Sequence, residues 1–393
     1  RTYDSYGNLG LIKDFGRKDV SGDERLTNSI FEPNLARYIL DRPVNLSNRN
    51  SLDPLGPLAS VEYYLYDNLP HGSAPIKGNL TQKVRVKQLA PTDIRSTESF
   101  EYDGFGNQVA ATDGIGRRSQ TFFDTATNLF PVEVRSPLYA ADNRHKTVLT
   151  YNMVCGAPSG RTGPDGVRIT YTYDAFCRPY IENNTVTGDY KYTRYIVSGS
   201  PTDQYVATYW PTPAGEVNRI AWIDGFGRTW RERSPGAVFN DVATKIDVLT
   251  QHDARGNIAS VSLPHLTGDA APLFVRTEFD WANRPVKTIR ADGTQQTLSY
   301  AVATSVAGVS NIPLSMTTHT DELNRVRKVW ESTDGKVIRI DRQLGAGWQS
   351  ETRSFDTLGR MTGVKDAGGA VWTNVYDMAG NRISASDPDL GTW

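Results

Sequence analysis

The 393-residue sequence is poor in the residues and patterns that mark several classes of protein. It has two Cys and five scattered His, too few at ligand spacing for a metal site. Lys and Arg total 43 and Asp and Glu total 44, so the formal net charge is −1. This balance offers no basic surface to nucleic acid or to an anionic membrane. No apolar run approaches the ~18 residues of a transmembrane helix. We therefore predict no cofactor, no metal ion, no nucleic-acid partner and no membrane insertion by this segment.

The two cysteines, Cys155 and Cys177, are expected to be free, partly buried thiols. A disulfide between them is the alternative that the sequence leaves open. The chain starts at Arg1 rather than Met and stops at Trp393, directly after the turn-like string "DPDLG". We therefore expect it to be part of a longer protein, whose targeting signals lie elsewhere.

Glycine and proline are plentiful, at 34 and 21 residues, which is typical of a folded, turn-rich β protein. A six-residue pattern also recurs: an aromatic or polar residue, Asp, two variable residues, Gly or Asn, then Arg or Asn. Its nine copies are "YDSYGN" at Tyr3, "YDGFGN" at Tyr102, "YDAFCR" at Tyr173, "IDGFGR" at Ile223, "HDARGN" at His252, "FDWANR" at Phe279, "TDELNR" at Thr320, "FDTLGR" at Phe355 and "YDMAGN" at Tyr376. Simpler Gly turns lie between them at 163 to 166, 290 to 293, 332 to 335 and 366 to 369.

Each copy of the pattern predicts a tight turn. Asp in the second position can accept hydrogen bonds from backbone N–H groups further along. Gly in the fifth position takes φ > 0 at little steric cost, as a type I turn with a bulge requires, and Asn is the next most tolerant residue. Cys177 fits this position less well, so we expect its turn to be distorted. The predicted turn residues are Tyr3, Asp4, Gly7, Tyr102, Asp103, Gly106, Tyr173, Asp174, Asp224, Gly227, Asp253, Gly256, Phe279, Asp280, Asp321, Phe355, Asp356, Gly359, Tyr376, Asp377 and Gly380.

The segments between turns alternate with a period of two residues and are rich in Thr, Tyr, Val, Ile and Phe, as in "RITYTYD" at 168 to 174. Late in the chain, turn aspartates recur every ten or eleven residues, which leaves strands of about six residues. The best helical candidate, "NLARYILDR" at 34 to 42, is short. The sequence therefore predicts an all-β protein, an antiparallel meander of short strands.

The tandem "YDxxGR" and "YDxxGN" turns, with "DG" turns half-way between them, resemble the RHS/YD-repeat family. That family includes bacterial polymorphic toxins, the B and C components of insecticidal toxin complexes, and the animal teneurins. The regular match covers residues 100–393, which we predict to be one repeat sheet. Residues 1–99 resemble the irregular lead-in section of toxin-complex B-like and SpvB-like proteins and are predicted to continue into that sheet.

The resemblance implies a long β-sheet that spirals into a hollow shell and encloses a C-terminal toxin or effector until delivery. This chain would be a non-catalytic wall segment of a secreted or translocated bacterial protein. Its partners would be further repeats, an N-terminal plug or capping domain, and the enclosed toxin. A large twisted sheet is also expected to curve, because each strand pair adds right-handed twist.

Other functions remain as alternatives. The first is an extracellular adhesive scaffold that binds glycans or protein receptors through loops, for which 50 to 92 and 185 to 215 are longer than a strand pair requires. Eight Trp and nineteen Tyr could stack on sugars, although cross-strand aromatic pairs are the simpler interpretation. Enzymatic readings are weak, because the aspartates recur at turns rather than around a cleft. The string "LDPLGPL" at 52 to 58 resembles an autoproteolysis motif, but its place before the repeats favours an ordinary turn.

Overall fold

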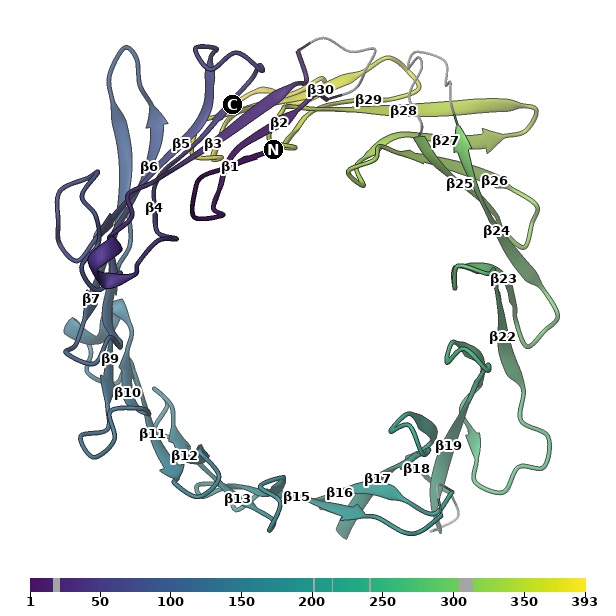
Figure 1. Cartoon of the computed structure of the whole chain (residues 1–393). Helices are drawn as coiled ribbons and strands as arrows, with labels where there is room; N and C mark the ends of the chain where they lie inside the picture. Colours follow the sequence, from purple (N-terminus) through teal and green to yellow (C-terminus); the bar gives the residue numbers. More distant parts are fainter. Residues whose placement is uncertain (17–21, 201, 214, 240–241, 304–313) are drawn as a thin grey trace. The chain divides into compact units, whose positions relative to one another are not determined.

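The computed structural model describes residues 1–16, 22–200, 202–213, 215–239, 242–303 and 314–393. Over these residues the chain forms 32 β-strands in one antiparallel sheet and contains no α-helix (Figure 1). The predicted all-β antiparallel class is confirmed. No helix in the described part of the chain is long and apolar enough to cross a membrane.

The strands are short and follow one another along the whole chain. The first sixteen are β1 (Thr2–Tyr3), β2 (Leu9–Asp14), β3 (Arg25–Phe31), β4 (Pro43–Arg49), β5 (Leu58–Tyr66), β6 (Leu80–Gln88), β7 (Ile94–Tyr102), β8 (Gln108–Thr112), β9 (Arg118–Phe123), β10 (Pro131–Arg135), β11 (Lys146–Asn152), β12 (Ala157–Thr162), β13 (Arg168–Tyr173), β14 (Pro179–Asn184), β15 (Tyr190–Ile196) and β16 (Tyr205–Thr212). The others are β17 (Gly215–Ile223), β18 (Thr229–Phe239), β19 (Val242–His252), β20 (Ile258–Ser262), β21 (His265–Leu266), β22 (Phe274–Phe279), β23 (Pro285–Ile289), β24 (Gln295–Ala303), β25 (Leu314–Thr320), β26 (Val326–Glu331), β27 (Val337–Leu344), β28 (Gly347–Phe355), β29 (Met361–Lys365), β30 (Val371–Tyr376), β31 (Arg382–Asp387) and β32 (Gly391–Thr392).

Strands pair mainly with their neighbours in sequence, as a meander requires. β21 is the exception among the described strands, because it pairs with β19 while β20 pairs onward with β22. At most repeat turns the register shifts by one residue just before the Asp, for example between Trp222 and Ile223 and between Val375 and Tyr376. Such a shift is the bulge that accompanies a type I turn closed by a residue with φ > 0.

The chain divides into two compact units. Unit 1 comprises Arg1–Thr121, Tyr300–His319 and Arg325–Trp393, and unit 2 comprises Phe122–Ser299 and Thr320–Asn324. Unit 1 therefore contains both ends of the sequence. The predicted boundary near residue 100 concerns the regularity of the repeats and stays a prediction.

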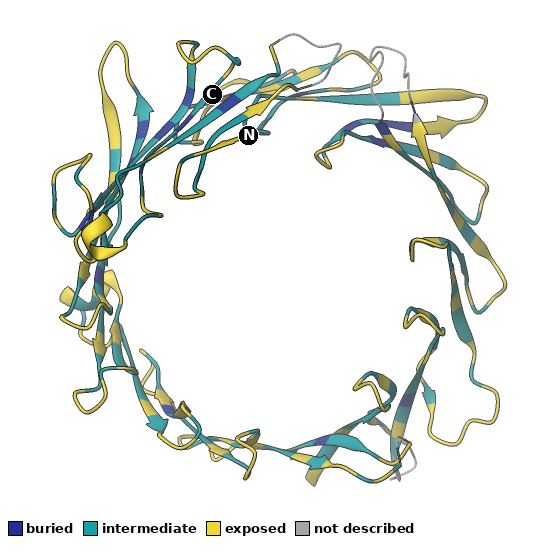
Figure 2. Cartoon of the chain, in the orientation of Figure 1, coloured by how far each residue is buried: buried dark blue, intermediate teal, exposed yellow. Residues whose placement is uncertain are grey.

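Most buried residues lie in short stretches of strand (Figure 2), and the loop residue Pro75 is also buried. Among the described residues, every buried hydrophobic side chain except Ala207 lies in unit 1. There Leu314, Trp330 and Ile338 form a small cluster. The accessible surface of the chain is 23740 Å², whereas a compact monomer of this mass would expose about 15,000 Å². A sheet that is mostly one layer thick explains the difference, because neither of its faces is fully covered.

One sequence expectation is corrected, and three segments are described in more detail. Cys155 and Cys177 are joined in a disulfide with a Cα–Cα distance of 5.3 Å, so neither is a free thiol. The segment 34 to 42 contains only the single-turn 3₁₀ helix η1 (Leu35–Arg37), and a second 3₁₀ helix, η2, spans Pro137–Ala140. The two long segments each contain two strands and additional chain: 185 to 215 contains β15 and β16, and 50 to 92 contains β5 and β6. Binding by their loops stays a prediction.

The disulfide joins the turn after β11 to the turn after β13, across 22 residues of sequence. A cross-link of this span stabilises by about 3 kcal/mol, mainly by restricting the unfolded chain. We expect the double variant Cys155→Ser/Cys177→Ser to unfold at a lower temperature than the native chain, as measured by scanning calorimetry. Dithiothreitol should produce the same shift in the native chain and none in the variant. A shift of equal size in both would show that the reductant acts elsewhere.

Candidate functional site: the repeated aspartate turns

Each repeat turn is organised around one carboxylate, as the turn at Asp224 illustrates. The backbone N–H of Asp224 donates to the carbonyl oxygen of Arg228 at 2.8 Å, and that of Gly227 donates to the Asp224 carbonyl at 3.0 Å. The Asp224 Oδ1 accepts the backbone N–H groups of Phe226 and Arg228, both at 2.9 Å. Four of the five backbone N–H groups in the turn are therefore satisfied within the turn itself.

The last residue of the pattern, Arg or Asn, closes the turn from its side chain. Arg228 donates from Nε to Asp224 Oδ2 at 2.8 Å, and Asn257 donates from Nδ2 to Asp253 Oδ2 at 2.9 Å. Both side chains present a planar N–H to the second carboxylate oxygen, which explains why Arg and Asn interchange at this position. The sequence shows this alternation, but its physical reason emerged only from the geometry.

The residue before the last adopts a left-handed conformation, whether it is Gly or not. Gly227 has φ +78°, Asn283 has φ +62° and Asn324 has φ +59°. Cys177 has φ +59°, and its N–H still donates to the Asp174 carbonyl at 3.0 Å. The expected distortion at Cys177 is therefore wrong. The disulfide to Cys155 holds the Cys177 side chain at the same sheet edge.

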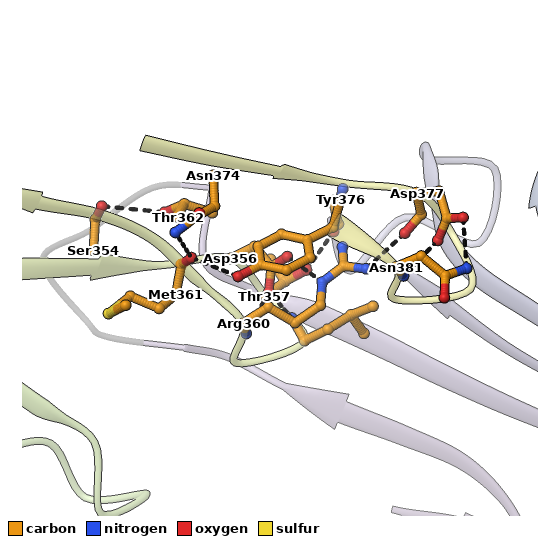
Figure 3. Close-up of polar contacts among 12 residues, drawn as sticks. Ser354, Asp356, Thr357, Arg360, Met361, Thr362, Asn374, Tyr376, Asp377 and Asn381 are labelled. Atoms are coloured by element: carbon orange, nitrogen blue, oxygen red, sulfur yellow. Dashed lines mark hydrogen bonds and ion pairs between the residues drawn. The ribbon is translucent and has the colours of Figure 1, made fainter. Parts of the chain in front are cut away.

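The tyrosine that precedes the Asp links one turn to the strand that begins after the previous turn. Figure 3 shows the Tyr376 hydroxyl directed at the carbonyl oxygen of Met361, to which it donates at 3.0 Å. Tyr173 donates in the same way to the Pro158 carbonyl at 2.6 Å. A buried or half-buried hydroxyl needs such a partner, and at these two turns the meander supplies one.

Neighbouring turns on one edge are also joined directly. Arg360 lies between Asp356 and Asp377 in Figure 3, and its Nη1 donates to the Asp377 carbonyl oxygen at 2.7 Å. Arg255 donates to the Asp280 carbonyl oxygen, also at 2.7 Å. These bonds run along the sheet edge, perpendicular to the hairpins, and so make adjacent repeats mutually dependent.

Hydrogen bonding keeps the turn carboxylates ionised. The side chain and backbone N–H of Arg228 hold the pKa of Asp224 below its ordinary value, and the Asn257 side chain does so for Asp253. Asp247 of β19 is buried between β18 and β21, and burial alone would raise its pKa. Hydrogen bonds from Arg233 and Arg231 instead lower the pKa of Asp247 to about 2.

The predicted site residues all lie in these turns or directly before them: Tyr3, Asp4 and Gly7; Tyr102, Asp103 and Gly106; Tyr173 and Asp174; Asp224 and Gly227; Asp253 and Gly256; Phe279 and Asp280; Asp321; Phe355, Asp356 and Gly359; Tyr376, Asp377 and Gly380. They are spread over many hairpins rather than gathered in one cleft. No group of three or more His, Cys, Asp or Glu is placed to hold a metal ion in the part of the chain that the structure describes. In a turn such as that at Asp224, both carboxylate oxygens accept hydrogen bonds, which suits a structural role.

Aromatic side chains pair across strands. Tyr192 and Tyr209 are register partners whose rings stack 4.5 Å apart with an interplanar angle of 5°. Tyr205 and Trp222, partners in the next pair of strands, have ring centroids 5.9 Å apart. These pairs agree with the simpler of the two interpretations made from the sequence, stiffening of the sheet.

The fold and the turns together define an all-β protein of repeated strand–turn units with a largely single-layered sheet. Comparison with solved structures finds the same fold in a toxin complex. The TcdB2-TccC3 complex matches 100% of this chain with a TM-score of 0.70 at 13% sequence identity. The Tc holotoxin pore of Photorhabdus luminescens matches 95% of it with a TM-score of 0.69 at 11% identity. TcdB2-TccC3 without its hypervariable C-terminal region matches 94%, with a TM-score of 0.69 at 11% identity.

At these identities the likeness is one of fold. This chain spans about a quarter of each matched chain, 26% for TcdB2-TccC3 and 27% for the other two. No family model matches the sequence, and no curated protein matches it either.

The turn at Asp103 offers a matched test of the left-handed position. Gly106 has φ +90° and Gly104 does not have a positive φ, and a Cβ added at either would meet open space. We expect Gly106→Ala to reduce the free energy of unfolding by about 1 kcal/mol, the cost of a left-handed L-residue. Gly104→Ala should leave it unchanged or slightly raised. Urea unfolding followed by circular dichroism measures both, and equal effects would mean that the turn conformation is not what limits stability.

The lowered pKa values predict how acid acts on the turns. An aspartate whose pKa is lowered by folding stabilises the protein above its ordinary pKa, and this contribution disappears as the pH falls through the folded value. We therefore expect Asp224→Asn to lower the unfolding temperature most at pH 7, with the gap from the native chain narrowing below about pH 4. Differential scanning fluorimetry from pH 7 to about pH 3 provides the test. A gap that stays constant with pH would contradict it.

Proposed function

We propose that the chain is a non-catalytic wall segment of an RHS-repeat shell, which encloses a C-terminal toxin or effector of the same protein before delivery. Its partners in this role are further repeats, a plug or capping domain and the enclosed polypeptide. The role implies a secreted or translocated bacterial protein. The observation that carries the proposal is the single-layered repeat sheet, whose exposed area is far above that of a compact protein of its mass.

A wall needs stiffness without a thick hydrophobic core, and the turn network supplies it. Unit 2 buries almost no hydrophobic side chain, yet its edge is joined by links such as that from Arg255 to Asp280 and by the disulfide. Stiffness of this kind comes from hydrogen bonds and cross-links rather than from packing between two layers. Both faces of the sheet therefore stay free, one to face solvent and the other to face the enclosed polypeptide.

The comparisons support the proposal, because the fold likeness does not depend on the hypervariable C-terminal region of the matched complex. The fold likeness persists over 94% of this chain when the hypervariable C-terminal region of TcdB2-TccC3 is absent. The part that resembles this chain is thus outside the variable region in that complex. We infer that this chain is a constant part of the wall and that the enclosed polypeptide, elsewhere in the parent protein, is the variable part.

A non-catalytic role agrees with the chemistry of the described residues. The repeated carboxylates are engaged by backbone N–H groups and by Arg or Asn side chains, as at Asp224 and Asp253. A general acid or base needs an oxygen that faces a substrate, and these oxygens face their own turns.

Limited proteolysis of the full-length protein with mass spectrometry tests the proposal. In the intact particle, we expect the C-terminal segment to survive protease concentrations that digest it once the particle is opened by mild acid or denaturant. The same segment expressed alone is the matched control and should be cut at the low concentration in both conditions.

Immediate cleavage of the C-terminal segment while these repeats stay whole would mean that nothing is enclosed. The adhesive alternative would then be examined by glycan-array and receptor binding with this chain.

A further inference from the structure

The tips of the repeat turns follow a size rule. Of the two variable residues after the Asp, one is large and the other is usually small, and the large one is usually apolar. The pairs are Gly104 and Phe105, Ala175 and Phe176, Gly225 and Phe226, Trp281 and Ala282, Thr357 and Leu358, and Met378 and Ala379. The turn at Asp4 also follows the rule, with Ser5 and Tyr6. Two turns depart from it: that at Asp253, with Ala254 and the basic Arg255, and that at Asp321, with Glu322 and Leu323. Each turn of this type therefore presents one bulky side chain at its tip.

The first of these two residues also carries a spare hydrogen-bond donor. The other four backbone N–H groups of the turn are used inside it, as at Asp224. In the part of the chain that the structure describes, the backbone N–H groups of Gly104, Ala254 and Trp281 have no hydrogen-bond partner. A turn tip thus combines an unpaired N–H with an apolar side chain, two features that favour contact with another backbone.

Two turns of unit 1 make such a contact. The backbone N–H of Met378 donates to the carbonyl oxygen of Lys87 at 3.0 Å. Lys87 is the residue skipped by the register of β6 with β7, so its carbonyl lies in a bulge and is free of the ladder. In the preceding turn, the Thr357 carbonyl accepts a hydrogen bond from Arg25 at 3.2 Å, and the Thr357 hydroxyl bonds to the Asn50 side chain.

The bulky tip residues of these two turns are correspondingly covered. Leu358 and Met378 are half-buried and line hollows against β4, β5 and β6, of about 230 Å³ and 490 Å³. Within unit 1, then, a row of repeat turns seats on the face of an antiparallel sheet from a distant part of the sequence. The side chains of Leu358 and Met378 lie in hollows on that sheet, and the Met378 N–H donates to the Lys87 carbonyl in the bulge.

The equivalent row in unit 2 is uncovered. Phe176 is 80% exposed, Phe226 86%, Trp281 86% and Val154, in the disulfide-linked turn, 92%. These turns share one sheet edge, because an even number of consecutively paired antiparallel strands separates each of them from the next. The Cys155–Cys177 disulfide also joins the turns of Val154 and Phe176 directly. Four large apolar side chains in a row along one edge are unusual for a surface that faces only water.

We propose that the edge of unit 2 carrying Val154, Phe176, Phe226 and Trp281 docks on another layer of antiparallel repeat strands from the same full-length protein. The seat has the chemistry of β4 to β6: half-buried apolar side chains beside a bulge carbonyl that accepts the N–H of Trp281. The inference rests on the proposed function, because a wall of several layers supplies the second sheet. It assigns the contact between layers to two turn positions that the repeat pattern leaves variable.

Hydroxyl-radical footprinting with mass spectrometry compares side-chain exposure in this chain and in the full-length protein. We expect oxidation of Phe226 and Trp281 to fall severalfold in the full-length protein, towards the level of the docked Leu358. Leu323 is the matched control. It is 71% exposed in the turn at Asp321, which contacts Arg290 and so belongs to the edge of the simpler turns. Its oxidation should not change.

The double variant Phe226→Ser/Trp281→Ser gives the energetic readout. It should lower the unfolding temperature of the full-length protein clearly more than that of this chain alone, in which Phe226 loses only its contact with the Arg228 guanidinium. Leu323→Ser should not produce this difference between the two proteins. If the full-length variant does not fold, the footprint of the native protein still decides.

Equal oxidation of Phe226 and Trp281 in the two proteins would overturn the inference. So would protection in this chain alone that grows with its concentration, since the occupant would then be a second copy. Failure of the docking edge and failure of the proposed function are distinguishable. If the C-terminal segment is protected from protease but Trp281 is oxidised equally in both proteins, the shell proposal holds and the docking inference is wrong. If the segment is cleaved but Trp281 is protected in the full-length protein, the docking inference holds and the shell proposal is wrong.

Discussion

The carboxylate at the centre of each repeat turn is the constraint on which the rest of the structure depends. A chain that reverses direction every ten or so residues leaves many backbone N–H groups outside the strand ladder, and each must find a partner. Asp supplies two acceptor oxygens within a single turn, and Arg or Asn four residues later occupies the second oxygen. The turn is thereby satisfied locally. It closes wherever the pattern occurs, without help from a core.

Local satisfaction explains how so large a sheet persists with few buried hydrophobic residues. Order passes from repeat to repeat through bonds along the edge: a Tyr hydroxyl to the strand after the previous turn, an Arg to the carbonyl of the next Asp, and one disulfide. Each of the hydrogen bonds contributes about 1 kcal/mol. Their number and regular spacing replace the contacts that a two-layered fold would make between its layers.

The same design separates constant from variable positions. The Asp, the left-handed residue and the closing Arg or Asn are turned inward on the turn, so their identity is fixed by hydrogen bonding. The two tip residues accept no hydrogen bond from the turn, and an aromatic tip such as Phe226 touches only the closing Arg228, so their identity varies from turn to turn. In unit 1 they are the residues that touch a second sheet, through Thr357 and Met378. Specificity of assembly can therefore reside in the tips while the repeat pattern stays intact.

The sequence by itself determined the fold class, the strands and the position of each turn, because the interactions that form them span only five residues. It was enough to predict φ > 0 at Gly227 or Asn283 and the capping role of Asp224. It misjudged Cys177, both its oxidation state and its turn geometry, and it gave no reason why Arg and Asn interchange at the closing position. The disulfide partner of Cys177 lies outside the six-residue pattern, and the way Arg and Asn both reach the Asp carboxylate depends on the three-dimensional arrangement of the turn.

Only the tertiary structure decided what depends on contacts between distant residues. The Cys155–Cys177 disulfide, the Tyr376 hydroxyl bond to Met361 and the seat of Met378 on Lys87 join atoms that are separated by 15 to nearly 300 residues. Strand register brings the first two pairs together, and packing of two distant parts of the sequence within unit 1 brings the third together. Hydrogen bonds within five residues form each turn, and contacts between residues far apart in the sequence determine which turns meet.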